Sequence, residues 1–192
     1  MRDEIIASQP RTRDGVIQQL SATAETPIQY EKHMTHHMPA GVDLSWTRDM
    51  KHVFLIREPD RVIASYRQKM PSVSAEAIGI IRQRELFDDI TAITGSRPPV
   101  IDSLDLLRDP EGVLRQLCHA LSVPWQEGAM TTWRRGRRRS DGIWASHWYA
   151  SVETSTHFSR PSDSPPQLDE ADRQLADLMM PHFDAMARFK LS

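Results

Sequence analysis

The fold is constrained most by residues 51–67, which have the sequence KHVFLIREPDRVIASYR. The first six residues are a short run with β-branched and aromatic side chains, which is typical of a buried parallel strand. Pro59 then presets φ for the first turn of a helix. Val62, Ile63 and Tyr66 follow at helical spacing. The run therefore predicts a strand, a sharp turn and a helix.

Two polar side chains stand at this predicted turn. Arg57 directly follows the strand, and Ser65 lies two turns into the helix. Open α/β sheets bind their ligands at the carboxyl ends of the strands. A guanidinium fork and a nearby hydroxyl suit one phosphate group. The alternative is a structural turn in which Arg57 caps the helix or pairs with Glu58 or Asp60.

The pattern of a strand followed by Arg-x-Pro-x-x-x-x-x-Ser resembles the 3′-phosphate-binding segment of the PAPS-dependent sulfotransferases. The resemblance implies that Arg57 and Ser65 hold the 3′-phosphate of 3′-phosphoadenosine 5′-phosphosulfate (PAPS) and of its product PAP. It also implies an α/β fold of three layers, α/β/α, with a parallel sheet of the P-loop nucleotide-binding class.

A second segment is similar to the same family. There, two basic residues precede a Gly-x-Trp and close over the 3′-phosphate. Counting back from Gly142 and Trp144 places Arg137 and Arg138 in the register of that pair. Arg139 stands where the family usually has Gly, which tolerates a positive φ that Arg resists. Taken without the resemblance, the arginines are equally a solvated basic face or a non-specific nucleic-acid patch.

The residues ahead of position 51 depart from the family pattern. The family begins with a strand and a Gly-, Ser- and Thr-rich loop whose amides hold the 5′-phosphosulfate. Here Gly15 and Gly41 are isolated. The resemblance therefore covers residues 28–158, and the domain is expected to be N-terminally truncated, as a fragment of a longer reading frame or a degenerate relative. The sheet edge left open predicts a homodimer or poor solubility.

The family's catalytic base is a His in a Lys-x-His sequence ahead of the Arg-x-Pro segment. A His suits this role because its ordinary pKa lies near neutrality. Lys32 matches the family's Lys, but Met34 occupies the position of the His. His36 and His37 are the remaining candidates. A surface role for these histidines, or a zinc site formed by His33, His36 and His37, is the alternative.

Composition limits the other classes of function. The 192 residues suit one domain, and the net charge of −2 argues against a polyelectrolyte binder of nucleic acid. The single cysteine, Cys118, excludes an internal disulfide or a Cys-based zinc site, and its helical pattern with leucines predicts a core position. No apolar run approaches the length of a membrane span, and no signal peptide is found at the start. These features predict a cytoplasmic protein with no membrane contact.

Local signals predict the remaining elements. We expect helices over residues 12–24, 75–93 and 168–188, strands over 27–32 and 98–103, and a Pro- and Ser-rich linker over 159–167. Asp109 and Pro110 should open a further helix. Ser74 should cap the helix of residues 75–93 and Gly95 should close it, whereas Pro181 should kink or end the last helix.

The sequence thus predicts a sulfotransferase-like domain. In the complete family the reaction is sulfuryl transfer from PAPS to a hydroxyl or amine of a small-molecule acceptor, and this chain alone is expected to be inactive. One alternative is a non-catalytic domain that binds PAP, another nucleotide or a protein partner. The other is a P-loop kinase-like protein, which is disfavoured because neither a Walker loop nor an Asp for Mg²⁺ at a strand end is found.

Overall fold

The computed structural model describes residues 2–8, 10–22, 26–138, 141–142, 145, 149–162 and 164–191. The chain divides into two compact units. The first unit comprises residues 1–32 and 127–158, and the second comprises residues 33–126 and 159–192. The organisation as one sulfotransferase-like domain stays a prediction.

The second unit is built on a parallel pair of three-residue strands. β1 (Phe54–Ile56) pairs with β2 (Val100–Asp102), and Ile56 lies opposite Asp102. On the other side of β2, the Leu191 amide donates to the Val100 carbonyl at 2.9 Å. The parallel pairing and the surrounding helices establish the α/β class predicted from the sequence. The three-layer P-loop arrangement stays a prediction.

Helices of the second unit follow the strands closely, as local signals predict. They are α3 (Pro59–Arg67), α4 (Ala75–Ile78), α5 (Ile80–Thr94), α6 (Ser103–Arg108), α7 (Pro110–Leu121) and α10 (Glu170–Ala187), with 3₁₀ turns η1 (Thr35–His37) and η2 (Ser45–Thr47). Asp109 caps α7 by accepting from the Gly112 amide at 2.9 Å, and Cys118 is buried on that helix. Both predictions are confirmed.

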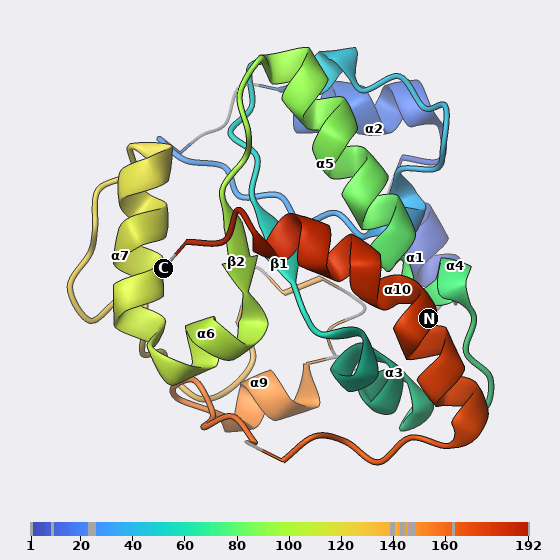
Figure 1. The fold of residues 1–192 in the computed structure, drawn as a ribbon. Coiled ribbons are helices and arrows are strands. Elements are labelled where there is room, and N and C mark those ends of the chain that lie inside the picture. The colour runs from blue at the N-terminus through green and yellow to red at the C-terminus, as the bar shows by residue number, and fades with distance from the viewer. Residues whose placement is uncertain are drawn as a thin grey trace. The chain divides into compact units, whose positions relative to one another are not determined.

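The core lies between the sheet and α10. Figure 1 shows α10 running between α5 and α3, and α10 contacts both of these helices and both strands. The buried cluster joins strands, α5 and α10 through Ile56, Val100, Ile80, Phe87, Met179, Phe183 and Met186. Met179 and Met186 of α10 are fully buried, so these methionines fill the core. The opposite face of β1 carries Leu55, which is 53% exposed.

Three predicted elements differ from the structure. The described residues 26–34 form no strand, because Ile28 and Tyr30 are 54% and 86% exposed and bury no face. Gly79, with φ of 74°, separates α4 from α5 within the predicted single helix. A Cβ at Gly79 would also collide with the Thr35 hydroxyl. Finally, α10 continues through Pro181, because the apolar face on both sides of it is buried in the core; of the kink or end expected there, the end is wrong.

The first unit contains α1 (Arg2–Ser8), α2 (Arg13–Leu20) and α9 (Ala150–Thr154). An antiparallel bridge joins Thr132 to His157, and beside it the Trp133 amide donates to the Thr156 carbonyl at 2.9 Å. The Trp133 ring packs edge-on against Phe158, with ring centroids 5.2 Å apart. The segment that leads into the arginine-rich loop is therefore held against the segment that follows α9.

A bidentate ion pair fixes the end of α3 against α10. Arg67 donates to both carboxylate oxygens of Asp172, at 2.8 Å and 2.7 Å, and also to the Pro71 carbonyl. Asp172 is buried, so its charge depends on this guanidinium for compensation. Hydrogen bonding from Arg67 lowers the pKa of Asp172 below its ordinary value of 3.8, although burial opposes the shift.

Replacing Asp172 by Asn should lower the melting temperature by several degrees at neutral pH, because Arg67 loses its charged partner. Asp177→Asn, at an exposed position of the same helix, should leave the melting temperature unchanged. A carboxyl whose pKa is depressed on folding contributes stability that is present above its unfolded pKa and lost as the pH falls through its folded pKa. The difference between wild type and Asp172→Asn should therefore shrink below about pH 4. Thermal unfolding that shows an unchanged difference in strong acid would contradict this account.

Candidate functional site

A pocket opens at the carboxyl end of β1, where the strand turns into α3. Its volume is about 440 Å³. One wall comes from the turn and α3 and the other from the segment after residue 159. The lining residues are Arg57, Arg61, Ala64, Ser65, Gln68, Ser162, Ser164, Pro165 and Pro166. Arg57, Arg61 and Ser65 recur every four residues, which places them on one side of the turn and helix. The structure thus brings the two predicted phosphate ligands of this segment, Arg57 and Ser65, to one pocket.

Arg57 presents an uncommitted guanidinium in this pocket. Its side chain makes no hydrogen bond or ion pair with the residues that the structure describes, so the alternative in which it pairs with Glu58 or Asp60 is not what the structure adopts. Burial lowers the pKa of Arg57, the charge of Arg61 lowers it further, and Asp60 opposes both. The guanidinium remains a cation at any physiological pH. A cation at a strand end that forms no ion pair with the described residues is suited to bind an anionic ligand.

The polar residues in the described lining of the pocket are two arginines, three serines and a glutamine. The described lining contains no carboxylate. Glu58 lies outside the lining and is paired with Arg61 at 2.9 Å. Ser65 is exposed on α3, so its hydroxyl is free to donate to a ligand. The arrangement is therefore suited to an anion that accepts several hydrogen bonds, such as a phosphate monoester.

The predicted second pair, Arg137 and Arg138, lies in the first unit. Both side chains are exposed. The Arg138 amide donates to Asp141 at 2.8 Å, and the preceding Gly136 amide donates to the Glu153 carbonyl at 2.8 Å. Arg139 lies outside the described residues, as does Trp144. Because Arg57 and Ser65 belong to the other unit, convergence of the two segments on one phosphate stays a prediction.

The histidine segment forms a tight turn in the second unit. His36 and His37 lie in η1, with ring centroids 4.5 Å apart, and the Met34 amide donates to Nδ1 of His37 at 3.3 Å. With Nδ1 as an acceptor, neutral His37 carries its proton on Nε2. Burial, and then the charges of His36 and His33, lower the pKa of His37 below its ordinary value of 6.5. A neutral imidazole suits a general base, but in this tautomer its one lone-pair nitrogen, Nδ1, already accepts from the Met34 amide, so His37 would have to release that hydrogen bond to take a proton.

The same turn is anchored on α5. Arg82 donates from Nε to the Met38 carbonyl at 2.8 Å and from Nη2 to the Pro39 carbonyl at 3.2 Å.

Lys32 is exposed at the end of the first unit. The catalytic roles of Lys32, His36 and His37 stay predictions. No three His, Cys, Asp or Glu side chains among the described residues gather as metal ligands, so the zinc alternative gains no support.

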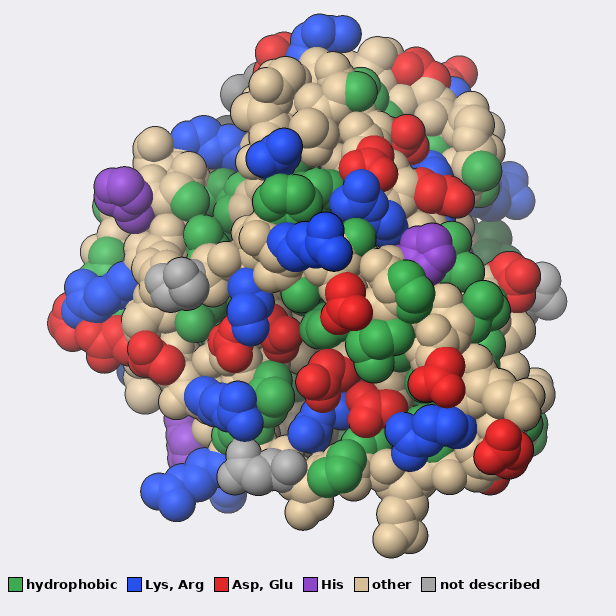
Figure 2. Space-filling view, in the orientation of Figure 1, with side chains coloured by type: hydrophobic (Ala, Val, Ile, Leu, Met, Phe, Trp, Pro, Cys, Tyr) green, Lys and Arg blue, Asp and Glu red, His purple; other side chains and the backbone are tan. Residues whose placement is uncertain are grey.

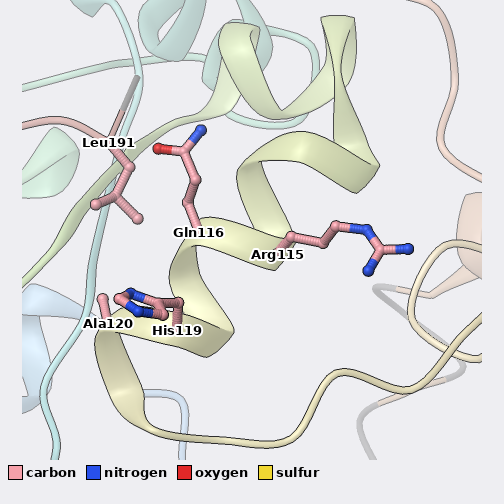
Figure 3. A pocket seen from close by; sticks show the side chains of 5 residues that line it. All are labelled: Arg115, Gln116, His119, Ala120 and Leu191. Carbon is pink, nitrogen blue, oxygen red and sulfur yellow. The ribbon is translucent and has the colours of Figure 1, made fainter.

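A second cavity, of about 410 Å³, lies along α7 beside the C-terminal Leu191. Figure 3 shows Gln116 and His119 on one side of the helix and the Arg115 side chain directed away from Leu191. Arg115 donates to Glu111 at 2.8 Å and lies over the Trp125 ring, 4.5 Å from its centroid. Its charge is thus already compensated, and we place the candidate site at Arg57 instead.

Some lining residues were not predicted from the sequence. Arg61 had a usable signal, since it lies one helical turn after Arg57 and one before Ser65. Ser162 and Ser164 had none, because the Pro- and Ser-rich composition of residues 159–167 indicates only a linker. Their place in the pocket depends on contacts across about one hundred residues of sequence.

The fold and the pocket define an α/β protein with an anion site at a strand end, and sequence comparison identifies its family. The family described as "Sulfotransferase domain" matches residues 1–189, and the chain belongs to it. The resemblance seen in the sequence is thereby confirmed.

Two curated relatives come from Arabidopsis thaliana. Branched-chain-amino-acid aminotransferase-like protein 1 is 30% identical over 186 residues, and branched-chain-amino-acid aminotransferase-like protein 2 is 27% identical over 186 residues. Each match covers 96% of this chain and 33% of the relative. The chain therefore spans about a third of the length of these relatives. No solved structure matches the chain. No helix within the described ranges is long and apolar enough to cross a membrane.

We expect the imidazole of His37 to titrate below pH 6.5 in an NMR pH titration, because burial and its two neighbouring histidines disfavour the charged form. His36→Asn should raise the His37 pKa toward 6.5 by removing one of these charges. His119→Asn, at an exposed position on α7, should leave it unchanged. A His37 midpoint at or above 6.5 in the wild-type protein would contradict the expected lowering of its pKa.

Proposed function

We propose that this chain binds the 3′-phosphate end of PAPS and PAP in the pocket at the end of β1. The observation that carries the proposal is the Arg57 guanidinium, which has no hydrogen-bond or ion-pair partner among the described residues and shares one pocket with the Ser65 hydroxyl. Membership in the sulfotransferase-domain family supports it, since PAPS is the donor that this family generally uses. The absence of a carboxylate from the described lining fits a phosphate that carries nearly two negative charges at neutral pH.

The reaction that follows from this assignment is sulfuryl transfer to a hydroxyl or amine of a small-molecule acceptor. PAPS supplies the sulfuryl group. The acceptor oxygen or nitrogen attacks sulfur in line with the bond to the leaving 3′,5′-bisphosphate, and a base takes the acceptor's proton. Arg57 would hold the 3′-phosphate, which orients the donor and neutralises part of its charge. His37 or His36 is our candidate base, with Lys32 as the cation of the same segment.

The aminotransferase-like name of the two relatives describes proteins of which this chain spans a third. The sulfotransferase family, in contrast, matches almost the whole chain. We therefore propose sulfuryl transfer rather than amino-group transfer for this region. A domain that binds PAP without catalysis would use the same pocket.

PAP should bind the chain more tightly than AMP, because only PAP carries the 3′-phosphate. Arg57→Ala should weaken PAP binding by about 1.5–3 kcal/mol, the usual range for a hydrogen bond to a charged group. It should change AMP binding much less. Isothermal titration calorimetry measures all four affinities.

Arg48→Ala is the matched control, because Arg48 is exposed in the same unit and does not line the pocket. It should leave both affinities at the wild-type level. Equal affinities of the wild-type protein for PAP and AMP would overturn the proposal.

The sequence predicts no sulfuryl transfer by the 192-residue chain alone. Ahead of β1, the described residues form helices and turns but no strand that could lead into a 5′-phosphosulfate loop. Loss of even one preorganised donor of this kind costs roughly 100- to 1,000-fold in rate. An assay with radiolabelled PAPS and phenol, alcohol and amine acceptors tests this. Robust turnover by the chain alone would contradict the prediction. Another segment would then hold the 5′-phosphosulfate.

A further inference from the structure

Arg61 occupies a central position in the pocket. Its Nε donates to the Glu58 carboxylate at 2.9 Å, and its Nη1 donates to the Ser162 carbonyl at 3.0 Å. Only 16% of the side chain is exposed. Arg61 thereby ties Ser162 to the start of α3. Because a guanidinium holds its donors in a rigid fork, both contacts fix its orientation in the pocket.

The fork retains unused donors. Nη2 of Arg61 makes no hydrogen bond to the part of the chain that the structure describes, although Arg61 lines the same pocket as Arg57. Two guanidinium cations that line one pocket repel each other, and the charge of Arg61 accordingly lowers the pKa of Arg57. An anion between them would relieve this repulsion and accept from both guanidinia.

The wall opposite α3 also offers groups for such a ligand. Ser162 and Ser164 can donate from their hydroxyls, and the rings of Pro165 and Pro166 present an apolar surface. The volume of about 440 Å³ leaves room for more than a phosphate group. Hydroxyl donors beside proline rings suit a phosphate on a ribose.

We propose that Arg61 and the segment holding Ser162, Ser164, Pro165 and Pro166, called the serine–proline wall below, form a second half of the phosphate site. Arg61 is a positioning residue for this wall and a second cation for the ligand. The phosphate is held between α3 and the wall, rather than on α3 alone. This inference rests on the proposed function, because it concerns the same pocket and ligand.

The test combines PAP affinity with hydrogen exchange of the intact chain. Arg61→Ala should weaken PAP binding about tenfold or more. Without ligand, it should also speed exchange in peptides covering residues 159–168, because the bond to the Ser162 carbonyl is lost. Arg57→Ala should weaken PAP binding but leave that exchange at the wild-type rate. Saturating PAP should slow exchange of the same peptides in the wild-type protein.

Ser164→Ala provides a milder probe in case Arg61→Ala fails to fold. It should weaken PAP binding about two- to tenfold, as expected for the loss of a neutral hydrogen bond. Ser159→Ala, in the same segment but outside the pocket lining, is its matched control and should bind PAP as the wild type does.

The outcomes separate this inference from the proposed function. If PAP binds, Arg57→Ala weakens it, and Arg61→Ala and Ser164→Ala both bind as the wild type does, the serine–proline wall is overturned while the phosphate site stands. Lack of PAP protection at residues 159–168 in the wild-type complex would also overturn the wall. If the wild-type protein fails to bind PAP at all, the proposed function fails, and the wall fails with it as a ligand site.

Discussion

The hydrogen bonds between β1 and β2 determine where the candidate site lies. Two strands of three residues are too short to persist alone, so their pairing depends on the core that α10 and α5 close over one face. Ile56, the last residue of β1, is fully buried in that core. The next residue, Arg57, is therefore held at the carboxyl edge of the sheet, where its guanidinium can face a ligand.

The helix that follows is held at both of its ends. At its start, Pro59 is buried and follows the strand after only two residues. At its last turn, Arg67 pairs with the buried Asp172 of α10. With α3 fixed in this way, the side chains at four-residue intervals, Arg57, Arg61 and Ser65, stay on the pocket side. The packing that stabilises the second unit thus also sets the positions of the charged and polar side chains in the pocket.

Elements with local signals were predicted well from the sequence. The start of α3 at Pro59 and the caps at Ser74 and Asp109 depend on neighbouring residues alone. The predicted strand at residues 27–32 failed because alternation of Ile28 and Tyr30 with polar residues cannot supply a pairing partner. A strand forms only where the backbone N–H and C=O groups of a neighbouring segment can hydrogen-bond with its own.

The site was predicted in part for the same reason. Arg57 and Ser65 belong to one short pattern, so their common pocket follows from the strand and helix around them. Thr35 lies where a Cβ at Gly79 would stand, and Arg61 donates to the Ser162 carbonyl. Such contacts join residues that are distant in the sequence, and no local pattern encodes them.

The face of the molecule in Figure 2 carries charges of both signs, and the described residues on it form no extended patch of one sign. Acidic and basic side chains alternate over the faces of α5 and α10 that it shows, as expected for ion pairs such as Arg82 with Glu85 and Arg84 with Asp88. We therefore attribute the attraction for a phosphate to the two guanidinia of the pocket.

A crystal structure of the chain with PAP tests the proposed phosphate site most directly. The account predicts the 3′-phosphate within hydrogen-bonding distance of the Arg57 guanidinium and the Ser65 hydroxyl. PAP bound elsewhere, with this pocket empty, would contradict it.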